Sequence, residues 1–257
     1  MPYLPIPGVD LYYEDTGGDG VPVVFLHALT GTADSWVHQI PAFTAAGYRC
    51  ITYDRRGWAR SQPKSSADHA EVGSDDLHAL IEGLSLERAH LVATAAGGIV
   101  AIDYALEHPE RVRSLVAANT IGGVQDEAYV AVRQRLRPKQ IQDLPPELRE
   151  LGPSYRGTDP EGVRRWVEIE EAGGLSEPRP FPPVRDAITF ARLASMNVPT
   201  LVLAGEADLL SPPALMRMLA AGIPGARYQS IPEVGHAGFW ERPNVWNGIV
   251  LEFIAGH

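Results

Sequence analysis

The sequence predicts an α/β fold in which helices cover both faces of a mostly parallel β-sheet. Short apolar runs rich in β-branched residues alternate with segments of helical period, which is typical of such layered folds. Several of the runs are apolar at every position, so a strand formed from them would have no face left for water. The chain has 257 residues, of which 45% are apolar, and is long enough to bury one large core.

Seven of the apolar runs are predicted to form strands. They lie at residues 9–14, 21–27, 48–53, 90–94, 112–118, 200–204 and 226–231. Helices are expected between them, at residues 33–46, 70–83, 96–108, 212–221 and 243–254. The third helix is expected to end before Pro109, because proline disfavours helical geometry in the residue that precedes it.

The alternation of strands and helices breaks within residues 121–186, where no strand is expected. Nine of the 22 prolines lie in the 46 residues from Pro138 to Pro183. That density is too high for a central strand or a regular helix. Charged helical pieces are expected between the prolines, at residues 127–137 and 162–171.

The proline-rich segment divides the chain into two parts. Residues 1–120 and 187–257 are predicted to form the α/β core, and residues 121–186 are predicted to be a helical insertion. A long disordered loop is the alternative. Apolar side chains such as Tyr155 and Trp166 argue against it, because a solvated linker would lack these anchors.

Composition and charge exclude several classes of protein. The 22 Lys and Arg against 32 Asp and Glu give a net charge of −10, and no window concentrates basic residues, so no nucleic-acid partner is expected. The single cysteine, Cys50, cannot form an intramolecular disulfide. No signal peptide and no membrane-spanning run is found, so the expected location is cytoplasmic. No phosphate loop and no cluster with metal-ligand spacing occurs, so neither a cofactor nor a metal is expected.

One segment, from Leu91 to Gly98, runs from a predicted strand directly into a predicted helix through small residues. So sharp a turn crowds the residues two before and two after its apex, which here are Ala93 and Gly97. The apex is Ala95. The segment resembles the nucleophile elbow of the α/β-hydrolase superfamily, whose pattern is small-x-nucleophile-x-Gly. This resemblance implies an eight-stranded, mostly parallel sheet with helices on both faces and a helical cap formed by the insertion.

Further segments match the same superfamily in chain order, and the resemblance covers nearly the whole chain. Residues 24–29 resemble the strand and loop that supply an oxyanion amide, and residues 53–61 resemble the Asp-x-Arg-Gly-x-Gly-x-Ser loop. The stretch ending at Asp208 is similar to the Gly-x-x-Asp turn that carries the catalytic acid, and the stretch around His236 is similar to the catalytic histidine loop. Asn119 stands where some relatives carry the acid, which leaves Asp208 as the candidate.

The resemblance assigns a role to each matching residue. A serine hydroxyl needs an imidazole to take its proton and a carboxylate to orient that imidazole, and these roles fall to His236 and Asp208. The backbone N–H groups of Leu29 and Ala96 are the implied oxyanion donors, Ala96 lying at the positive end of the helix after the elbow.

Alanine at position 95 is the main departure from the family pattern, because a methyl group cannot attack a carbonyl. The favoured interpretation is a serine hydrolase in which alanine replaces the nucleophile, since Asp208, His236 and the oxyanion loops are present. The second is a natural relative that does not form an acyl-enzyme, either a binding protein or an enzyme that uses the histidine as a general base. The third, attack by Thr94, is disfavoured because the apex presents only one side chain to the site.

Five aromatic residues are candidates for lining an apolar substrate pocket, and the alternative for each is that it packs the insertion onto the core. They are Trp58, Tyr129, Tyr155, Trp166 and Phe239. The chain also resembles small bacterial esterases, enol-lactonases and non-metal perhydrolases. That resemblance implies a small apolar or aromatic ester or lactone as substrate, with C–C bond hydrolysis of a diketone as a further alternative.

Overall fold

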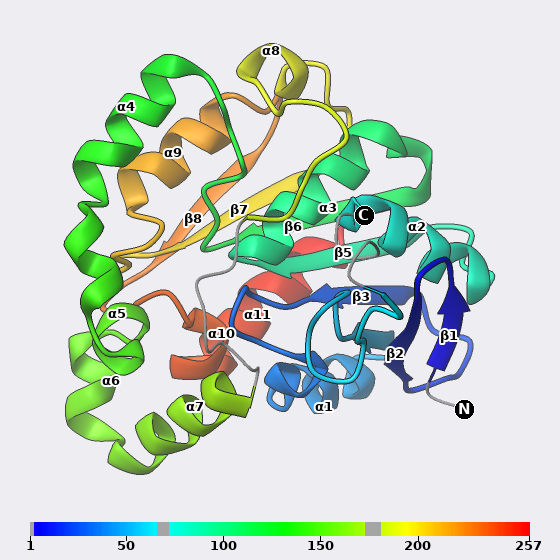
Figure 1. The fold of residues 1–257 in the computed structure, drawn as a ribbon, viewed down its shortest axis with the longest axis horizontal. Coiled ribbons are helices and arrows are strands. Elements are labelled where there is room, and N and C mark those ends of the chain that lie inside the picture. Colours follow the sequence, from blue (N-terminus) through cyan, green and yellow to red (C-terminus); the bar gives the residue numbers. More distant parts are fainter. Residues whose placement is uncertain (1–2, 66–71, 173–180) are drawn as a thin grey trace.

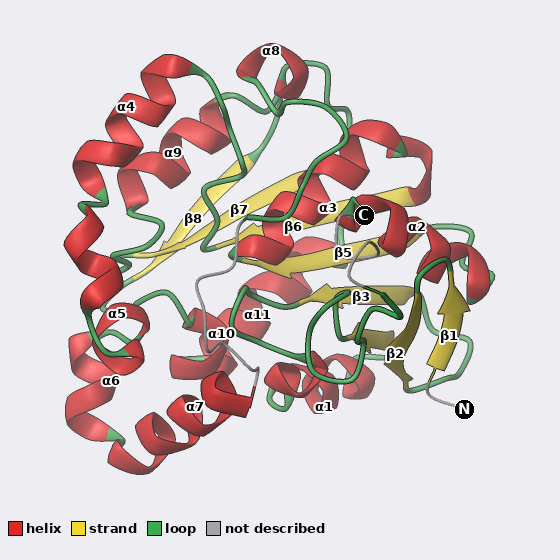
Figure 2. Cartoon of the chain, in the orientation of Figure 1, coloured by secondary structure: helices red, strands yellow, loops and turns green. Residues whose placement is uncertain are grey.

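The computed structural model contains one eight-stranded sheet with helices on both faces (Figures 1 and 2). It describes residues 3–65, 72–172 and 181–257. The strands are β1 (Tyr3–Ile6), β2 (Val9–Asp15), β3 (Pro22–Leu26), β4 (Arg49–Tyr53), β5 (Ala89–Thr94), β6 (Val112–Ala118), β7 (Thr200–Gly205) and β8 (Arg227–Ile231). Their order across the sheet is β1-β2-β4-β3-β5-β6-β7-β8. The pairs β1–β2 and β2–β4 are antiparallel and the others are parallel, which confirms the predicted fold class.

All seven predicted strands are present, with ends shifted by one residue at most. β1 was not among them. It lies at the edge of the sheet, pairs only with β2, and alternates exposed with half-buried residues. A short edge strand that contains Pro5 carries little of the buried, β-branched pattern by which the other strands are recognised.

The core helices are close to those predicted, with one correction. They are α1 (Gln39–Ala45), α2 (Gly73–Gly83), α3 (Ala96–Glu107), α9 (Pro213–Ala221) and α11 (Pro243–Ile254). The single helix predicted at 33–46 is instead a 3-10 turn, Ala33–Trp36, followed by α1. Pro41 explains the break, because its ring would clash with the Val37 carbonyl of a continuous helix. Residues 70 and 71 of the predicted helix 70–83 lie outside the described residues.

Alternate residues of the central strands form two separate cores, one on each face of the sheet. Val24 and Leu26 of β3 pack in a cluster with α2, α3 and α9, whereas Val23 and Phe25 pack with α1 and α11. All four side chains are fully buried. The strands that end at the site are therefore held from both sides.

The described part of the chain between β6 and β7 contains helices joined by loops, and no strand. It forms α4 (Glu127–Leu136), a 3-10 turn (Lys139–Asp143), α5 (Pro146–Glu150), α6 (Pro153–Thr158), α7 (Pro160–Ala172) and α8 (Phe190–Leu193). Proline is the first residue of α5, α6 and α7, a position where its missing N–H costs no hydrogen bond. Figure 1 shows α4 alongside α9, and α5, α6 and α7 grouped near α10 (Gly238–Glu241).

Within the three described stretches of the chain, no helix is both long and apolar enough to cross a bilayer.

Candidate active site

The turn between β5 and α3 holds Ala95 in a backbone conformation that side-chain-bearing residues rarely adopt. Its φ is 49° and its ψ is −117°. The Ala95 N–H donates to the Ala118 carbonyl on β6 at 3.0 Å, and the Gly98 N–H donates to the Ala95 carbonyl at 3.1 Å. Such strain costs about 1–3 kcal/mol and persists only where the surroundings impose it. The turn therefore keeps this shape with a methyl group at its apex.

Gly97 sits against the end of β3, two residues after the apex. A Cβ atom on Gly97 would lie 2.3 Å from the Leu26 carbonyl oxygen and 2.7 Å from that of His27. Ala93, two residues before the apex, is fully buried. The tight approach brings the start of α3 next to the loop that follows β3.

The loop after β3 is fixed by hydrogen bonds to its carbonyl groups. The Ala28 carbonyl accepts from Arg55 Nη2 at 2.9 Å and lies 2.7 Å from His27 Nδ1. The Leu29 carbonyl accepts from Trp58 Nε1 at 2.5 Å. The Leu29 N–H and the Ala96 N–H have no acceptor among the described residues. The two predicted oxyanion donors thus lie on elements that Gly97 brings together.

Asp208 and His236 are in direct contact at the carboxyl ends of β7 and β8. His236 Nδ1 lies 3.0 Å from Asp208 Oδ1 and 2.9 Å from Oδ2, and both side chains are buried. Burial alone would raise the pKa of Asp208, but the charge of His236 and hydrogen bonds from His236, Asn119 and Ser211 bring that pKa below its ordinary value. An ionised carboxylate at Nδ1 places the proton on that nitrogen and leaves Nε2 able to accept another.

Asn119 connects this pair to the turn at Ala95. Its Nδ2 donates to Asp208 Oδ2 at 2.9 Å and to the Gly235 carbonyl at 3.2 Å. The Asn119 backbone N–H donates to the Leu203 carbonyl at 2.9 Å. Ala118, the residue before Asn119, has the carbonyl that accepts from the Ala95 N–H. The sequence excluded Asn119 as the acid, but it missed this positioning contact. A polar residue at the end of a buried strand is the signal that could have identified it.

Comparison with known proteins identifies the family of the chain. The family profile described as the alpha/beta hydrolase fold matches residues 21–168, more than half of the chain. A Mycobacterium tuberculosis protein named as the non-heme bromoperoxidase BpoC is 33% identical, over 96% of this chain and 98% of its own. The chain belongs to the α/β-hydrolase fold family.

Solved structures and a further relative resemble the chain over nearly its full length. The crystal structure named for BpoC from M. tuberculosis H37Rv has a TM-score of 0.73 at 29% identity and covers 96% of both chains. A protein of Azorhizobium caulinodans named as the carbamate hydrolase RutD is 31% identical, over 98% of each chain. A thermophilic esterase from Thermogutta terrifontis has a TM-score of 0.76 at 25% identity, over 100% of this chain and 97% of its own. This α/β-hydrolase therefore has relatives named as hydrolases.

The histidine loop of this α/β-hydrolase is attached to the segment between β6 and β7. The Glu150 carbonyl at the end of α5 accepts from the His236 N–H at 2.6 Å and from the Ala237 N–H at 3.2 Å. The carboxyl group of Glu241 accepts from the Gly235 N–H at 2.9 Å and from the Gly152 N–H at 2.9 Å. None of these contacts was predicted, and all but the one between Gly235 and Glu241 join residues far apart in the sequence.

Two buried carboxyl groups in this attachment have raised pKa values. Burial raises the pKa of Glu241 to about 7, against hydrogen bonds from Gly235 and Gly152 that lower it. Burial and the neighbouring Glu170 raise the pKa of Glu150 well above its ordinary value. Within the described residues, no three His, Cys, Asp or Glu side chains are placed to hold a metal ion.

The five aromatic candidates fall into different environments, and three of them are packed away from water. Tyr129 on α4 is fully buried, and its hydroxyl donates to the Ile121 carbonyl at 2.9 Å. Trp166 on α7 and Phe239 on α10 have 2% and 1% of their surfaces exposed, with ring centroids 5.8 Å apart. These three side chains join the segment to the core, which is the alternative that the sequence left open.

Trp58, Tyr155 and Thr94 complete the set of side chains considered from the sequence. Trp58 is half-buried, and the centroid of its ring lies 4.3 Å from the guanidinium carbon of Arg55. Its Nε1 donates to the Leu29 carbonyl and so fixes the loop after β3. Tyr155 is half-buried on α6 beside the cluster that contains Trp166 and Phe239. The Thr94 hydroxyl is buried without a hydrogen-bond partner among the described residues, so it forms no hydrogen bond with His236.

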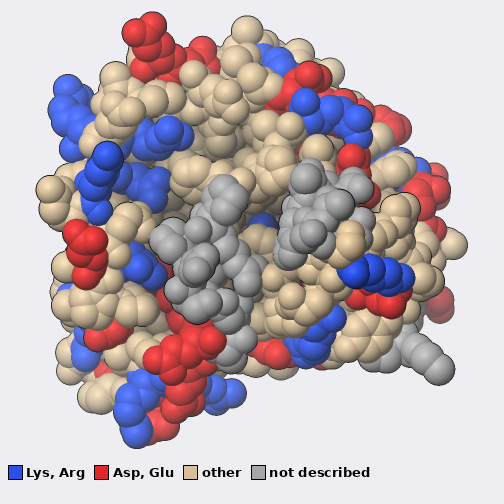
Figure 3. All heavy atoms as spheres, viewed as in Figure 1, with Lys and Arg blue, Asp and Glu red and all other residues tan. Residues whose placement is uncertain are grey.

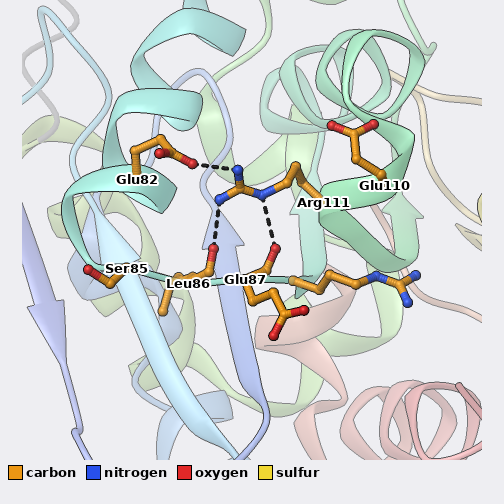
Figure 4. Close-up of a pocket in the computed structure, with 7 residues that line it drawn as sticks. Glu82, Ser85, Leu86, Glu87, Glu110 and Arg111 are labelled. Carbon is orange, nitrogen blue, oxygen red and sulfur yellow. Dashed lines mark hydrogen bonds and ion pairs between the residues drawn. The ribbon is translucent and has the colours of Figure 1, made fainter.

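An open depression of about 570 Å³ lies at the opposite end of the sheet, where residues 85–88 lead into β5. Figure 4 shows the residues that line it. The Arg111 guanidinium donates to the carbonyl groups of Leu86 at 2.8 Å and Glu87 at 2.9 Å, and it pairs with Glu82 at 2.5 Å. The Arg111 guanidinium is therefore already paired. The depression is separate from the residues that meet at the carboxyl ends of β5, β7 and β8. Its lining is Glu82, Ser85, Leu86, Glu87, Arg88, Glu110 and Arg111.

Proposed function

We propose that the site is that of a carboxylic ester or lactone hydrolase in which residue 95 holds the nucleophile position. With alanine there, the chain keeps the substrate site but cannot form an acyl-enzyme. The observation that carries the proposal is the strained turn at Ala95, linked through Ala118 and Asn119 to the buried Asp208–His236 pair. The relative named as an esterase, and those named as hydrolases, support the reaction class.

The chemistry follows from the position of each group. A serine at position 95 would give its proton to His236 Nε2 and attack the carbonyl carbon, while Asp208 stabilises the charged imidazole. The Leu29 and Ala96 N–H groups would hold the oxyanion. The imidazolium would return the proton to the leaving alcohol, and water would release the acid by the same route. The helices of residues 121–186 would cover the site as a cap.

The direct test is Ala95→Ser, referred to below as the serine variant, with short-chain p-nitrophenyl esters and small lactones as substrates. We expect hydrolysis to rise by about 10³-fold or more over the starting chain. The matched control is Ala95→Ser combined with His236→Ala, which should return the rate to the starting level. A serine variant with unchanged thermal stability that hydrolyses none of these substrates would refute the proposal.

A second candidate is general-base hydrolysis, in which His236 activates water without an acyl-enzyme. It is favoured by one observation: the contacts of His236 with Asp208 and Glu150 do not involve the side chain at position 95. In this case the starting chain would itself hydrolyse an activated ester, and His236→Ala would abolish that rate. Equal rates for the starting chain and His236→Ala would exclude it.

A further inference from the structure

Glu170 is a buried acid on a helix whose other acids face the solvent. It lies on α7, and 5% of its surface is exposed. The exposed glutamates of the same helix are Glu161, Glu168 and Glu171. Figure 3 shows Asp and Glu atoms at the surface where Figure 1 shows α7. Glu170 follows Trp166 by one turn on the same helix face, and the Trp166 ring packs on Trp240 of α10 at 5.6 Å, so Glu170 lies on a helix that is fixed to the core.

The Glu170 side chain shares an arginine with a second buried carboxyl group, that of Glu150. Glu150 is the last residue of α5, which packs against α7, and 3% of its surface is exposed. Arg149 Nη2 lies 3.0 Å from Glu150 Oε1 and 3.6 Å from Glu170 Oε2. In the part of the chain that the structure describes, no other basic side chain forms an ion pair with either carboxyl group. Two carboxylates beside one guanidinium would leave a net negative charge away from water, which is unfavourable.

A single proton held between the two carboxyl groups removes this excess charge. Glu170 Oε1 is buried, and no donor within the described residues forms a hydrogen bond to it. A carboxylate can only accept, whereas a protonated carboxyl group also donates, so one proton converts two repelling acceptors into a hydrogen-bonded pair. Burial, the charge of Glu170 and a hydrogen bond with Glu170 raise the pKa of Glu150 well above its ordinary value. The pair therefore keeps a proton at a pH at which an exposed glutamate has lost its own.

The other ionisable groups on the neighbouring elements are engaged elsewhere. The Glu241 carboxyl group on α10 accepts from two backbone N–H groups, and the His236 ring contacts Asp208. The Arg156 guanidinium on α6 donates to backbone carbonyl groups. Glu147, one turn before Glu150 on α5, adds a further negative charge. Arg149 is therefore the cation that holds the carboxyl pair, and the shared proton supplies the rest of the compensation.

The pair is joined to His236 through the backbone of Glu150. The Glu150 carbonyl accepts from the His236 N–H at 2.6 Å and from the Ala237 N–H at 3.2 Å. The approach is close because the residue before the histidine is a glycine, and a Cβ atom on Gly235 would lie 2.6 Å from the same carbonyl oxygen. A movement of the end of α5 would therefore also move the histidine loop.

We propose that Glu170 is a positioning residue for His236: it holds one proton together with Glu150, fixes the end of α5, and so keeps the Glu150 carbonyl on the His236 N–H. When the proton leaves to solvent, the two carboxylates repel each other and the end of α5 moves away from α7. The imidazole then shifts relative to position 95, and a shift of about 1 Å can cost about 100-fold in rate. The inference rests on the proposed function, in which His236 is the base.

The alternative is that Glu170 only packs α7 against α5. Packing predicts a loss of stability when the side chain is truncated, but no dependence of catalysis on the charge of the pair. The amide introduced by Glu170→Gln separates the two roles, because it keeps the size of the side chain and can donate an N–H to the Glu150 carboxylate at every pH. This variant keeps the connection and removes its dependence on a proton.

The first test measures kcat and KM of the serine variant between roughly pH 6 and 9. The same measurements are made with Glu170→Ala, Glu170→Gln or the exposed control Glu168→Gln added. We expect Glu170→Ala to lower kcat about 10-fold at neutral pH with little change in KM. Glu170→Gln should retain kcat and lack the fall at alkaline pH that the serine variant shows, and Glu168→Gln should leave the pH profile unchanged.

The second test needs no turnover and uses the chain with Ala95. The NMR signal of the His236 backbone N–H reports on its hydrogen bond to the Glu150 carbonyl, and it is assigned with isotope-labelled histidine and the variant His236→Gln. We expect this amide proton to move upfield as the pair loses its proton at alkaline pH. In Glu170→Gln the signal should stay constant over the same range.

Three results would overturn the positioning role: an unchanged kcat and pH profile with Glu170→Ala, a loss of kcat in Glu170→Gln as large as in Glu170→Ala, or the same pH dependence of the His236 amide with and without Glu170→Gln. Any of these in an active serine variant would leave the reaction supported. A folded serine variant without activity, whose amide signal still titrates as expected, would refute the reaction and support the positioning role. If Glu170→Ala does not fold, Glu170→Gln and the amide signal decide.

Discussion

The pH dependence of stability should report on Glu241, the carboxyl group that ties the histidine loop to the segment between β6 and β7. Its two oxygens accept from the Gly235 and Gly152 N–H groups, at 2.9 Å each. Burial raises its pKa from 4.5 to about 7, with the Asp208 charge also raising it and His236 opposing. Folding therefore makes this carboxyl group bind its proton more tightly.

The size of the effect follows from that difference in pKa. At pH 4.5 and below, Glu241 is protonated in the folded chain, and its contribution to stability is complete. As the pH rises from 4.5 to about 7, the unfolded chain loses the proton first, so the contribution is lost. At 1.36 kcal/mol for each pH unit, this amounts to about 3 kcal/mol.

The measurement is urea unfolding between pH 4 and 8, roughly the range in which carboxyl and imidazole groups titrate, for the starting chain and for Glu241→Gln. An amide has a single acceptor oxygen, so one of the two N–H groups loses its partner, and we expect stability at low pH to fall by about 1–3 kcal/mol. Between pH 4.5 and 7, the free energy of unfolding should fall less in Glu241→Gln than in the starting chain. The difference is the contribution of one titrating carboxyl group. The control is Glu168→Gln, an exposed acid on α7. Identical slopes for the starting chain and Glu241→Gln would refute this reasoning.

Three further substitutions test the parts that position the site. Gly97→Ala places a Cβ atom 2.3 Å from a backbone oxygen and should cost more than about 3 kcal/mol in urea unfolding, whereas the control Gly157→Ala, with nothing within 4 Å, should be neutral or stabilising. Trp58→Phe removes the donor to the Leu29 carbonyl, so kcat/KM of the serine variant should fall about 10-fold with little change in stability. Asn119→Ala removes a hydrogen bond to a buried carboxylate and should cost about 1–3 kcal/mol and lower kcat of the serine variant; an unchanged kcat would deny it a positioning role.

The central part of the fold could be predicted from the sequence because its strands are buried on both faces. A run such as Val112–Ala118 has no amphipathic alternative, and the strand was predicted with its observed bounds. The elements that failed are those for which local pattern is weak or is overridden. β1 is a short edge strand, and the helix predicted at 33–46 is interrupted by Pro41. A single neighbouring strand, β2, decides whether β1 forms, and a single residue, Pro41, decides where the predicted helix breaks.

The candidate site divides in a similar way. Motif order along the chain was enough to predict that Asp208 and His236 belong together, and the structure places them 2.9 Å apart. The roles of the aromatic residues could not be predicted, because packing contacts and pocket lining both require large apolar side chains. The Glu150 carbonyl that accepts from the His236 N–H was beyond sequence reasoning, because a backbone acceptor has no residue type to mark it.

One feature of this site has an unfavourable energy that a purely structural role would not require. Ala95 keeps a strained backbone although it has no nucleophilic side chain. The bond from its N–H to the Ala118 carbonyl, and the bond from the Asn119 side chain to Asp208, join this turn to the Asp208–His236 pair. Strain of this kind is common where a protein is organised around a ligand. An ester or lactone substrate would use it, since its carbonyl group would lie at the turn beside the N–H groups of Leu29 and Ala96.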